Sequence, residues 1–161
     1  IGDNIKNIKN NKVLILFLLI PLSLGLLSFL LTREGINNYM TLNKPSFAPS
    51  RYLFFLVWPV LYFLMGLSSY KIYESLSYHK CTCLIIYTLN LILNFFWPLI
   101  FFNLEARLFA FIFILLLDFV VFYMILCFYG LDKKAGIMQI PYLIWLIYAS
   151  ILNFSVYFLN R

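Results

Sequence analysis

Five long apolar runs, almost free of charge, limit how this chain can fold. Each is roughly 20 residues, the length with which an α-helix crosses the hydrocarbon core of a bilayer. A membrane-spanning strand needs only about ten residues of alternating polarity, so strands are excluded. The runs cover residues 13–31, 52–70, 81–102, 108–129 and 137–159. The sequence therefore predicts an all-α membrane protein, a single domain over residues 1–161 in which five transmembrane helices form a bundle.

Composition indicates that lipid is the solvent for much of this surface. The chain is 64% hydrophobic and 11% charged, whereas a soluble domain is about half apolar and a quarter charged. The net charge of +6 does not indicate a nucleic-acid partner, because the basic residues are spread over the tail, the loops and the C-terminus. We expect the lipid bilayer as a partner and no nucleic acid.

The N-terminal stretch 1–12 is polar and is expected to be a short tail or a surface turn. The apolar run after it is too long for the core of a signal peptide and ends without a small-x-small cleavage site, so we interpret it as the first span. Seven of the twelve Lys and Arg residues fall on the N-terminal side of the predicted bundle, which favours a cytosolic N-terminus. A bacterial cell membrane is favoured over the mitochondrial outer membrane.

One predicted loop is much longer than the others. It covers residues 32–51, between the first and second spans, and contains Pro45 and Pro49, which favour extended backbone. In a protein with so little outside the membrane, a long ordered loop is either a lid or a linker. Pro59, Pro98 and Pro141 fall inside the second, third and fifth spans, where each should kink its helix or lie near its start.

The cysteines do not suggest a disulfide scaffold, because there are only three of them. Cys127 lies in an apolar run and is expected to be a small buried hydrophobic residue. His79, Cys81 and Cys83 offer at most three ligands at one helix end, so no metal site is expected.

Polar and aromatic side chains recur at helical spacing in three of the spans. A polar group in a span costs free energy unless it is paired or faces a cavity. If the three stripes converge, they form an apolar slot with a few polar anchors, suited to a planar aromatic ligand. The alternative, which the pattern alone favours, is that the amides join helices and the rings belong to the interfacial belt. The stripes are Trp58, Tyr62 and Met65; Asn90, Asn94 and Trp97; and Tyr142, Trp145, Ala149 and Asn153.

Four stretches resemble, in order and spacing, the TspO/MBR family of translocator proteins. The first is Asn-Lys-Pro-Ser-Phe-Ala-Pro at 43–49. The second, at 57–66, holds Val-Trp, Leu-Tyr and Met-Gly pairs, and the third, at 93–102, holds Leu-Asn, Trp and Phe-Phe. The fourth, at 135–160, holds Ala-Gly, Pro-Tyr-Leu-Ile-Trp and two Leu-Asn pairs. Together they cover the chain from about Tyr39 to its end.

The resemblance implies a five-helix bundle, commonly a homodimer, that binds porphyrins such as protoporphyrin IX or haem, drug-like aromatic ligands and, in some members, sterols. No cofactor is required beyond such a ligand. The loop of residues 32–51 would close over it. The ligand-binding residues that the resemblance implies are Tyr39, Lys44, Pro49, Trp58, Tyr62, Asn90, Asn94, Trp97, Tyr142, Trp145, Ala149 and Leu152.

The chain also departs from the family pattern. Asn90 stands where members usually have Gln, Ser50 replaces the second residue of a Pro-Pro pair, and Tyr52 replaces a Trp. Asp118 stands where an apolar or aromatic residue is usual. We expect this carboxylate to be a proton or ligand handle or, the favoured alternative, to lie at a dimer seam bonded to a Tyr.

These observations favour a membrane receptor or binding protein for tetrapyrroles and other planar hydrophobic ligands. One alternative is an enzyme that degrades porphyrin in light and oxygen, as some bacterial members of the family are reported to do, with Trp58 and Trp145 as catalytic residues. The other is a transporter of porphyrin- or sterol-like ligands. Against transport stand the missing internal repeat and, Asp118 excepted, the lack of ion-coupling charges.

Overall fold

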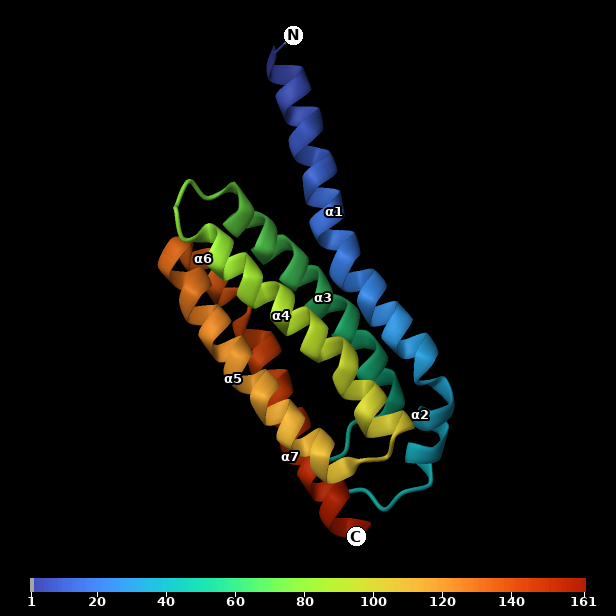
Figure 1. The fold of residues 1–161 in the computed structure, drawn as a ribbon. Coiled ribbons are helices and arrows are strands. Elements are labelled where there is room, and N and C mark those ends of the chain that lie inside the picture. Colours follow the sequence, from blue (N-terminus) through green and yellow to red (C-terminus); the bar gives the residue numbers. More distant parts are fainter. Residues whose placement is uncertain (1) are drawn as a thin grey trace.

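The computed structural model describes residues 2–161, and helices make up nearly all of it (Figure 1). Within these residues there are no strands. The elements are α1 (Gly2–Leu31), α2 (Arg33–Met40), α3 (Arg51–Glu74), α4 (Lys80–Pro98), the π-helical turn η1 (Leu99–Asn103), α5 (Arg107–Leu131), α6 (Lys133–Ile137) and α7 (Ile140–Leu159).

Five segments of the described chain are long and apolar enough to cross a membrane. They are α1 with α2, α3, α4 with η1, α5, and α6 with α7. The prediction of an all-α membrane bundle is confirmed, and each predicted span lies in one of these segments. The reason is that lipid offers no partner for backbone N–H and C=O groups, so each apolar run must satisfy them within a helix.

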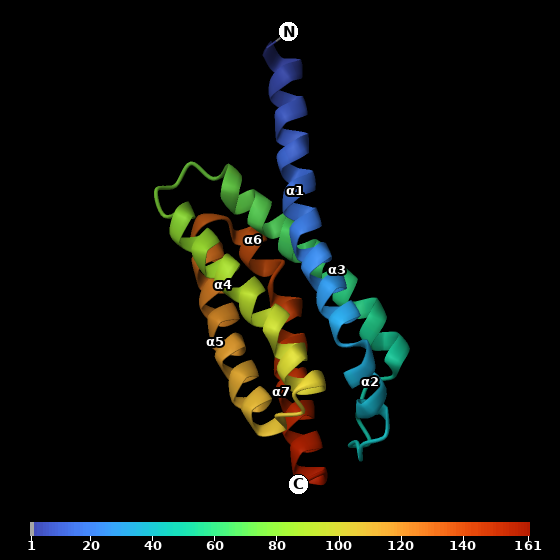
Figure 2. The same cartoon turned by 45° about the vertical axis from the view of Figure 1, so that its right-hand side comes forward.

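The N-terminal stretch is not the tail or turn expected for residues 1–12. Ile1 lies outside the described residues, and α1 is already helical at Gly2. Adding a residue to an existing helix gains one hydrogen bond for each residue fixed, and Lys has a good helix propensity. The N-terminal half of α1 therefore continues the first span and projects beyond the other helices (Figures 1 and 2).

The twenty-residue loop predicted for residues 32–51 is wrong. Its first part forms α2, and only Thr32 and residues 41–50 are without helix. Two buried residues, Gly35 and Ile36, give α2 a packed face against η1. A Cβ at position 35 would collide with the carbonyl of Phe102, so this close approach depends on glycine. Pro45 and Pro49 confine the non-helical backbone to the segment between α2 and α3.

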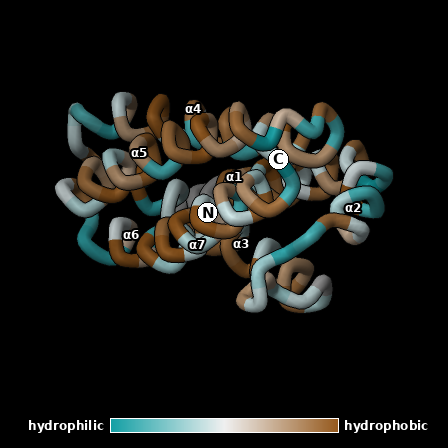
Figure 3. The backbone as a smooth tube through the Cα atoms, turned by 90° about the horizontal axis from the view of Figure 1, so that it is seen from below, coloured by the Kyte–Doolittle hydropathy of each residue, from teal (hydrophilic) through white to brown (hydrophobic). Residues whose placement is uncertain are grey.

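The spans pack in a defined order. α1 lies on α3 and α4, α5 packs against both α4 and α7, and the short α6 contacts α3 and α5. Large apolar side chains, among them Leu16, Phe119 and Ile144, are more than half exposed on the outer surface, where lipid would surround them. In Figure 3 hydrophobic colour covers much of the long helices, and hydrophilic colour gathers at connecting segments and around α2.

The three prolines predicted to kink a span or to lie near its start have different positions. Pro141 lies in the first turn of α7, where its missing N–H costs nothing. Pro98 is the last residue of α4, at the change to the π-helical turn, and Pro59 lies inside α3. The π-helical turn buries Phe101 and Phe102 at one end of the bundle.

A disulfide joins Cys83 of α4 to Cys127 of α5, so the expectation of an unpaired Cys127 is wrong. The sequence places both residues in apolar runs, but only helix packing brings their Cα atoms within 5.7 Å. Cys81 is free and exposed. Among the described residues, no group of three or more His, Cys, Asp or Glu could hold a metal ion.

Candidate ligand-binding site

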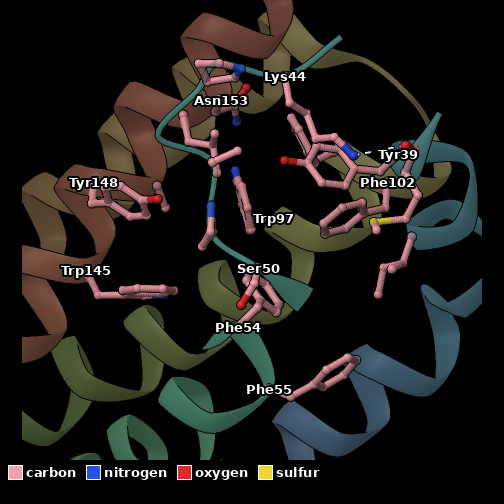
Figure 4. A pocket seen from close by; sticks show the side chains of 18 residues that line it. Tyr39, Lys44, Ser50, Phe54, Phe55, Trp97, Phe102, Trp145, Tyr148 and Asn153 are labelled. Atoms are coloured by element: carbon pink, nitrogen blue, oxygen red, sulfur yellow. Dashed lines mark hydrogen bonds between the residues drawn. The ribbon is translucent and has the colours of Figure 1, made fainter. Parts of the chain in front are cut away.

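Two neighbouring cavities open at the α2 end of the bundle. The first, which we name the loop pocket, has a volume of ≈ 330 Å³ and lies between α2, the segment 41–50, η1, α3 and α7 (Figure 4). The second, which we name the α1–α3 cleft, has a volume of ≈ 500 Å³. Both volumes are in the range of small-molecule sites.

Hydrogen bonds to α7 and to Asn160 just beyond it hold the segment 41–50 over the loop pocket. The Asn160 side chain accepts from the backbone N–H of Asn43 at 3.0 Å and donates to its carbonyl at 2.8 Å. The Tyr148 hydroxyl donates to the carbonyl of Phe47 at 2.7 Å, and the two rings are 6.3 Å apart. These contacts tie the segment to the end of the last span, so it covers the pocket in a defined conformation.

Ser50 ends this segment and begins α3. Its hydroxyl accepts from the backbone N–H of Leu53 at 3.3 Å, which makes Ser50 the N-cap of α3. Serine is a preferred N-cap because its side chain satisfies a backbone donor that the helix leaves free. Where the family pattern has the second proline of a Pro-Pro pair, this chain therefore has a serine that caps the next helix.

Lys44 is, among the described residues, the only charged residue that lines either cavity. Its Nζ donates to the carbonyl of Met40 at 2.9 Å and lies 5.2 Å from the ring centroid of Tyr39. The Tyr39 ring packs in turn against Phe101 and Phe102 at centroid distances of 5.7 and 5.5 Å. A positive charge thus lies at the rim of a pocket that is otherwise mainly apolar, on the opposite side from Trp145 and Tyr148 (Figure 4).

Trp97 is anchored at the centre of the loop pocket. When the Asn153 amide is oriented to satisfy both of its ends, its oxygen accepts from Trp97 Nε1 at 3.2 Å and its nitrogen donates to the Arg107 carbonyl at 3.1 Å. The Trp97 ring stacks on Phe101 at 5.4 Å with an interplanar angle of 15°. Across the pocket, Trp145 packs on Tyr148 at 5.4 Å. Two indole rings therefore line the same cavity.

The α1–α3 cleft contains the other predicted tryptophan. Trp58 and Tyr62 line it, with their rings 5.4 Å apart, and the Tyr62 hydroxyl accepts from Asn94 Nδ2 at 3.3 Å. A Cβ on Gly25 of α1 would collide with the Tyr62 ring, so glycine allows α1 to approach it. Phe54 connects the two sites, because its ring is 5.9 Å from that of Trp58 and 6.5 Å from that of Trp145.

The predicted site residues are thus distributed over three places rather than one. Trp58 and Tyr62 line the α1–α3 cleft, and Asn90, Asn94 and Tyr142 line neither cavity. Those that line the loop pocket are Tyr39, Lys44, Pro49, Trp97, Trp145, Ala149 and Leu152.

Sequence reasoning missed several lining residues. Tyr148 follows Trp145 by three residues and Phe54 precedes Trp58 by four, so both lie on stripes already recognised, and helical spacing could have found them. Ile36 lies in α2, which was expected to be loop, and no signal pointed to it.

A model of the TspO/MBR family matches residues 17–159 of this chain. The chain belongs to the TspO/MBR family. It is 33% identical to the Tryptophan-rich protein TspO of Archaeoglobus fulgidus over 148 residues, 91% of this chain and 96% of that protein. It is 33% identical to Protein CrtK of Rhodobacter capsulatus over 76% of this chain and 78% of that one. The Translocator protein of Bos taurus is 32% identical over 88% of this chain and 86% of its own length.

In this TspO/MBR protein, Asn90 and Tyr142 connect helices. The Tyr142 hydroxyl donates to Asn90 Oδ1 at 2.9 Å, and both side chains are buried. The bond joins α7 to α4. Amides in membrane helices often hold neighbouring helices together in this way, which is the alternative that the sequence pattern alone favours.

Asp118, unexpected for a TspO/MBR protein, is bonded within its own chain. Its Oδ2 accepts from the Ser150 hydroxyl of α7 at 2.7 Å, so a serine and not a tyrosine is its observed partner. The other oxygen, Oδ1, is buried with no hydrogen-bond partner among the described residues. The carboxyl group therefore lies in the seam between α5 and α7.

Proposed function

We propose that this TspO/MBR protein is a membrane receptor or binding protein for tetrapyrroles, such as protoporphyrin IX or haem, and for other planar hydrophobic ligands. The observation that carries the proposal is the loop pocket, where two tryptophan rings line one apolar cavity with Lys44 at its rim. Flat indole rings stack on planar aromatic molecules. Few polar groups in an apolar cavity are typical of small-molecule sites.

Lys44 gives the proposal a chemical test. Protoporphyrin IX carries two carboxylates on one edge of a planar apolar ring, and an ammonium group at the pocket rim would attract them. An exposed ion pair contributes about 1 kcal/mol at most, which is roughly fivefold in affinity. Lys44→Gln should therefore weaken protoporphyrin IX binding about three- to fivefold. Binding of the uncharged dimethyl ester should not change. Lys12→Gln, outside both cavities, is the matched control.

The three tryptophans allow binding to be measured without a label. Titration of protoporphyrin IX into purified protein in nanodiscs should quench tryptophan fluorescence to saturation. Trp145→Phe and Trp97→Phe should each reduce the quenching and weaken binding, because each removes a stacking surface from the loop pocket. Asn94→Ala tests whether the predicted site residues that line neither cavity contribute to binding. Unchanged affinity in both tryptophan variants would refute the pocket assignment.

Light-dependent degradation of the porphyrin is the second candidate. It is supported by the position of Phe54, whose ring lies next to those of both Trp58 and Trp145, so the two predicted catalytic residues adjoin one aromatic cluster. Under illumination with oxygen, bound porphyrin should disappear with first-order kinetics that Trp58→Phe or Trp145→Phe slows. An equal rate with an unrelated membrane protein would exclude enzymatic turnover.

A homodimer, which the family resemblance implies, and a location in a bacterial cell membrane are part of the same proposal. Chemical crosslinking in native membranes should trap a species of twice the mass, and fractionation should recover the chain with the cell membrane.

Flux of protoporphyrin into proteoliposomes, compared between the unmodified chain and Asp118→Asn, tests the alternative that the protein is a transporter.

A further inference from the structure

The loop between α3 and α4, residues 75–79, presents two large apolar side chains to its surroundings. Leu76 is 101% exposed and Tyr78 is 95% exposed. The serines that alternate with them hold the backbone, because Ser75 Oγ accepts from the N–H of Ser77 at 3.2 Å and Ser77 Oγ accepts from the N–H of His79 at 3.2 Å. Leu76 and Tyr78 therefore project together from a loop that local hydrogen bonds keep in shape.

This loop lies where two spans end. One candidate span ends at Glu74 and the next begins at Lys80. The loop is at the α6 end of the bundle, opposite the end where α2 lies (Figure 1). Exposure of a whole leucine side chain to water is unfavourable, and tyrosine is enriched at the boundary between hydrocarbon and headgroups. The position and the chemistry of both side chains therefore match the membrane interface.

Four lysines lie at the same end of the bundle, which we name the basic end. They are Lys71 of α3, Lys80 of α4, and Lys133 and Lys134 of α6. Hydrogen bonds join the segments that carry them. The Ser68 hydroxyl donates to the Ala135 carbonyl at 2.9 Å, which ties α3, one turn before Lys71, to the residue after Lys134. Lys80 Nζ donates to the Tyr73 carbonyl at 3.3 Å, which ties the start of α4 to the end of α3.

The positive charge of the basic end is not cancelled. Two acidic residues lie there, and each carboxylate accepts a hydrogen bond: Glu74 from the Tyr70 hydroxyl at 2.6 Å, and Asp132 from the backbone N–H of Ala135 at 2.8 Å. None of the four lysines forms an ion pair with a described residue. Lys133 and Lys134 are exposed. The basic end therefore offers ammonium groups to an anionic partner outside the bundle.

We propose that the basic end is a binding surface for anionic phospholipids, in which Leu76 and Tyr78 insert among the headgroups and the lysines bind headgroup phosphates. A zwitterionic lipid carries the same phosphate next to a compensating cation, so lysines attract anionic lipid more strongly. A soluble acidic protein would also match the charge, but the position of Leu76 and Tyr78 at the ends of two spans favours lipid. The surface is at the opposite end of the bundle from the loop pocket, so this proposal is independent of the proposed function.

Lipid selectivity tests the lysines. Purified protein in detergent micelles is titrated with phosphatidylglycerol and with phosphatidylcholine of the same chain length, and bound lipid is counted by native mass spectrometry. The test variant is Lys133→Gln with Lys134→Gln. The matched control is Arg33→Gln with Arg161→Gln, which removes two exposed positive charges away from the basic end. Thermal unfolding checks that each variant is folded.

We expect the unmodified chain to prefer phosphatidylglycerol at least tenfold. The lysine variant should lose about tenfold of that preference, since each lysine near an anionic surface contributes up to about fivefold. The arginine variant should keep it. Equal binding of both lipids to the unmodified chain would overturn the proposal. So would an unchanged preference in the lysine variant, or the same loss in the arginine variant.

Insertion of the loop is measured separately. Leu76→Cys, in a chain that also carries Cys81→Ser, is labelled with a fluorophore and reconstituted into nanodiscs. Leu116→Cys in the same background is the control for a lipid-facing position, because Leu116 is 50% exposed on α5. Phospholipids brominated near the glycerol end of the acyl chain should quench both labels, and aqueous iodide should quench neither strongly. A label at position 76 that only iodide quenches would overturn the proposal and leave the loop facing water, open to a soluble partner.

Discussion

Tyr142 donates a hydrogen bond to Asn90 across the bundle, over 2.9 Å between two fully buried side chains. The amide nitrogen of Asn90 has no partner among the described residues. The oxygen is therefore the only anchored end of this amide, and α7 is held to α4 at the level where Asn90 stands in place of the usual Gln.

Tyr142→Phe should destabilise the protein without altering ligand affinity. The change leaves the Asn90 oxygen unpaired, and buried hydrogen bonds between membrane helices contribute about 0.6 kcal/mol on average and up to about 1.7. Because Tyr142 lines neither cavity, protoporphyrin binding should stay within a factor of two. Thermal unfolding in detergent measures the first effect. Tyr123→Phe, on a residue that is 55% exposed, is the control and should be neutral.

Ser150→Ala should lower the free energy of unfolding more than the double variant Asp118→Leu with Ser150→Ala does. The single change leaves a carboxyl group at the α5–α7 seam without its only observed partner, at a cost of about 1–3 kcal/mol. Removing both partners eliminates the unpaired polar group, so much of that loss should be recovered. A double-mutant cycle of unfolding free energies measures the coupling. Additive effects would show that the bond contributes nothing.

Gly66→Ala should loosen the packing of α1 on α3. A Cβ at position 66 would lie 2.5 Å from the Phe17 carbonyl oxygen and 2.8 Å from Leu18 Cα, and backbone atoms can yield only if the helices separate. We expect the free energy of unfolding to fall by about 1–3 kcal/mol. At Gly130 an added Cβ meets nothing within 4 Å, so Gly130→Ala should stabilise by up to about 1 kcal/mol. A larger loss at Gly130 than at Gly66 would contradict this packing.

Reduction of the Cys83–Cys127 disulfide should lower stability by about 2–4 kcal/mol, since the bond closes a long segment of chain. The paired variant Cys83→Ala with Cys127→Ala should show the same loss and no further effect of reductant. Cys81→Ser should behave like the unmodified chain. Titration of thiols in unfolded protein should find one before reduction and three after it. Three thiols before reduction would refute the bond.

Cys81 can report the orientation of the chain. The excess of positive charge favours a cytosolic N-terminal side, and Cys81 lies on that side of the bundle, near the start of α4. A membrane-impermeant maleimide should therefore label Cys81 only after permeabilisation. The disulfide makes the opposite prediction, because such bonds persist mainly in oxidising compartments and Cys83 is only two residues further on. Labelling of intact cells would reverse the proposed orientation.

Sequence by itself determined the number and position of the spans. Runs such as 52–70 carry no charge and are as long as the bilayer is thick, so lipid leaves the helix as their only conformation. It also determined which side chains share a face, since the spacing of Asn90, Asn94 and Trp97 follows from helix geometry. The four family stretches, in order, were sufficient to indicate the family to which the chain belongs.

Only the tertiary structure decided what each face meets. Spacing shows that Asn90 lies on a stripe, but not that Tyr142, 52 residues away, supplies its partner. Nor does it show that Cys83 faces Cys127, or that Phe54 stands between Trp58 and Trp145 so that two cavities form where one was expected. Such contacts depend on how far each helix is rotated and how closely it approaches its neighbours. Rotation and approach are set by packing across the whole bundle, as at Gly66 and Phe17, and no single helix specifies them.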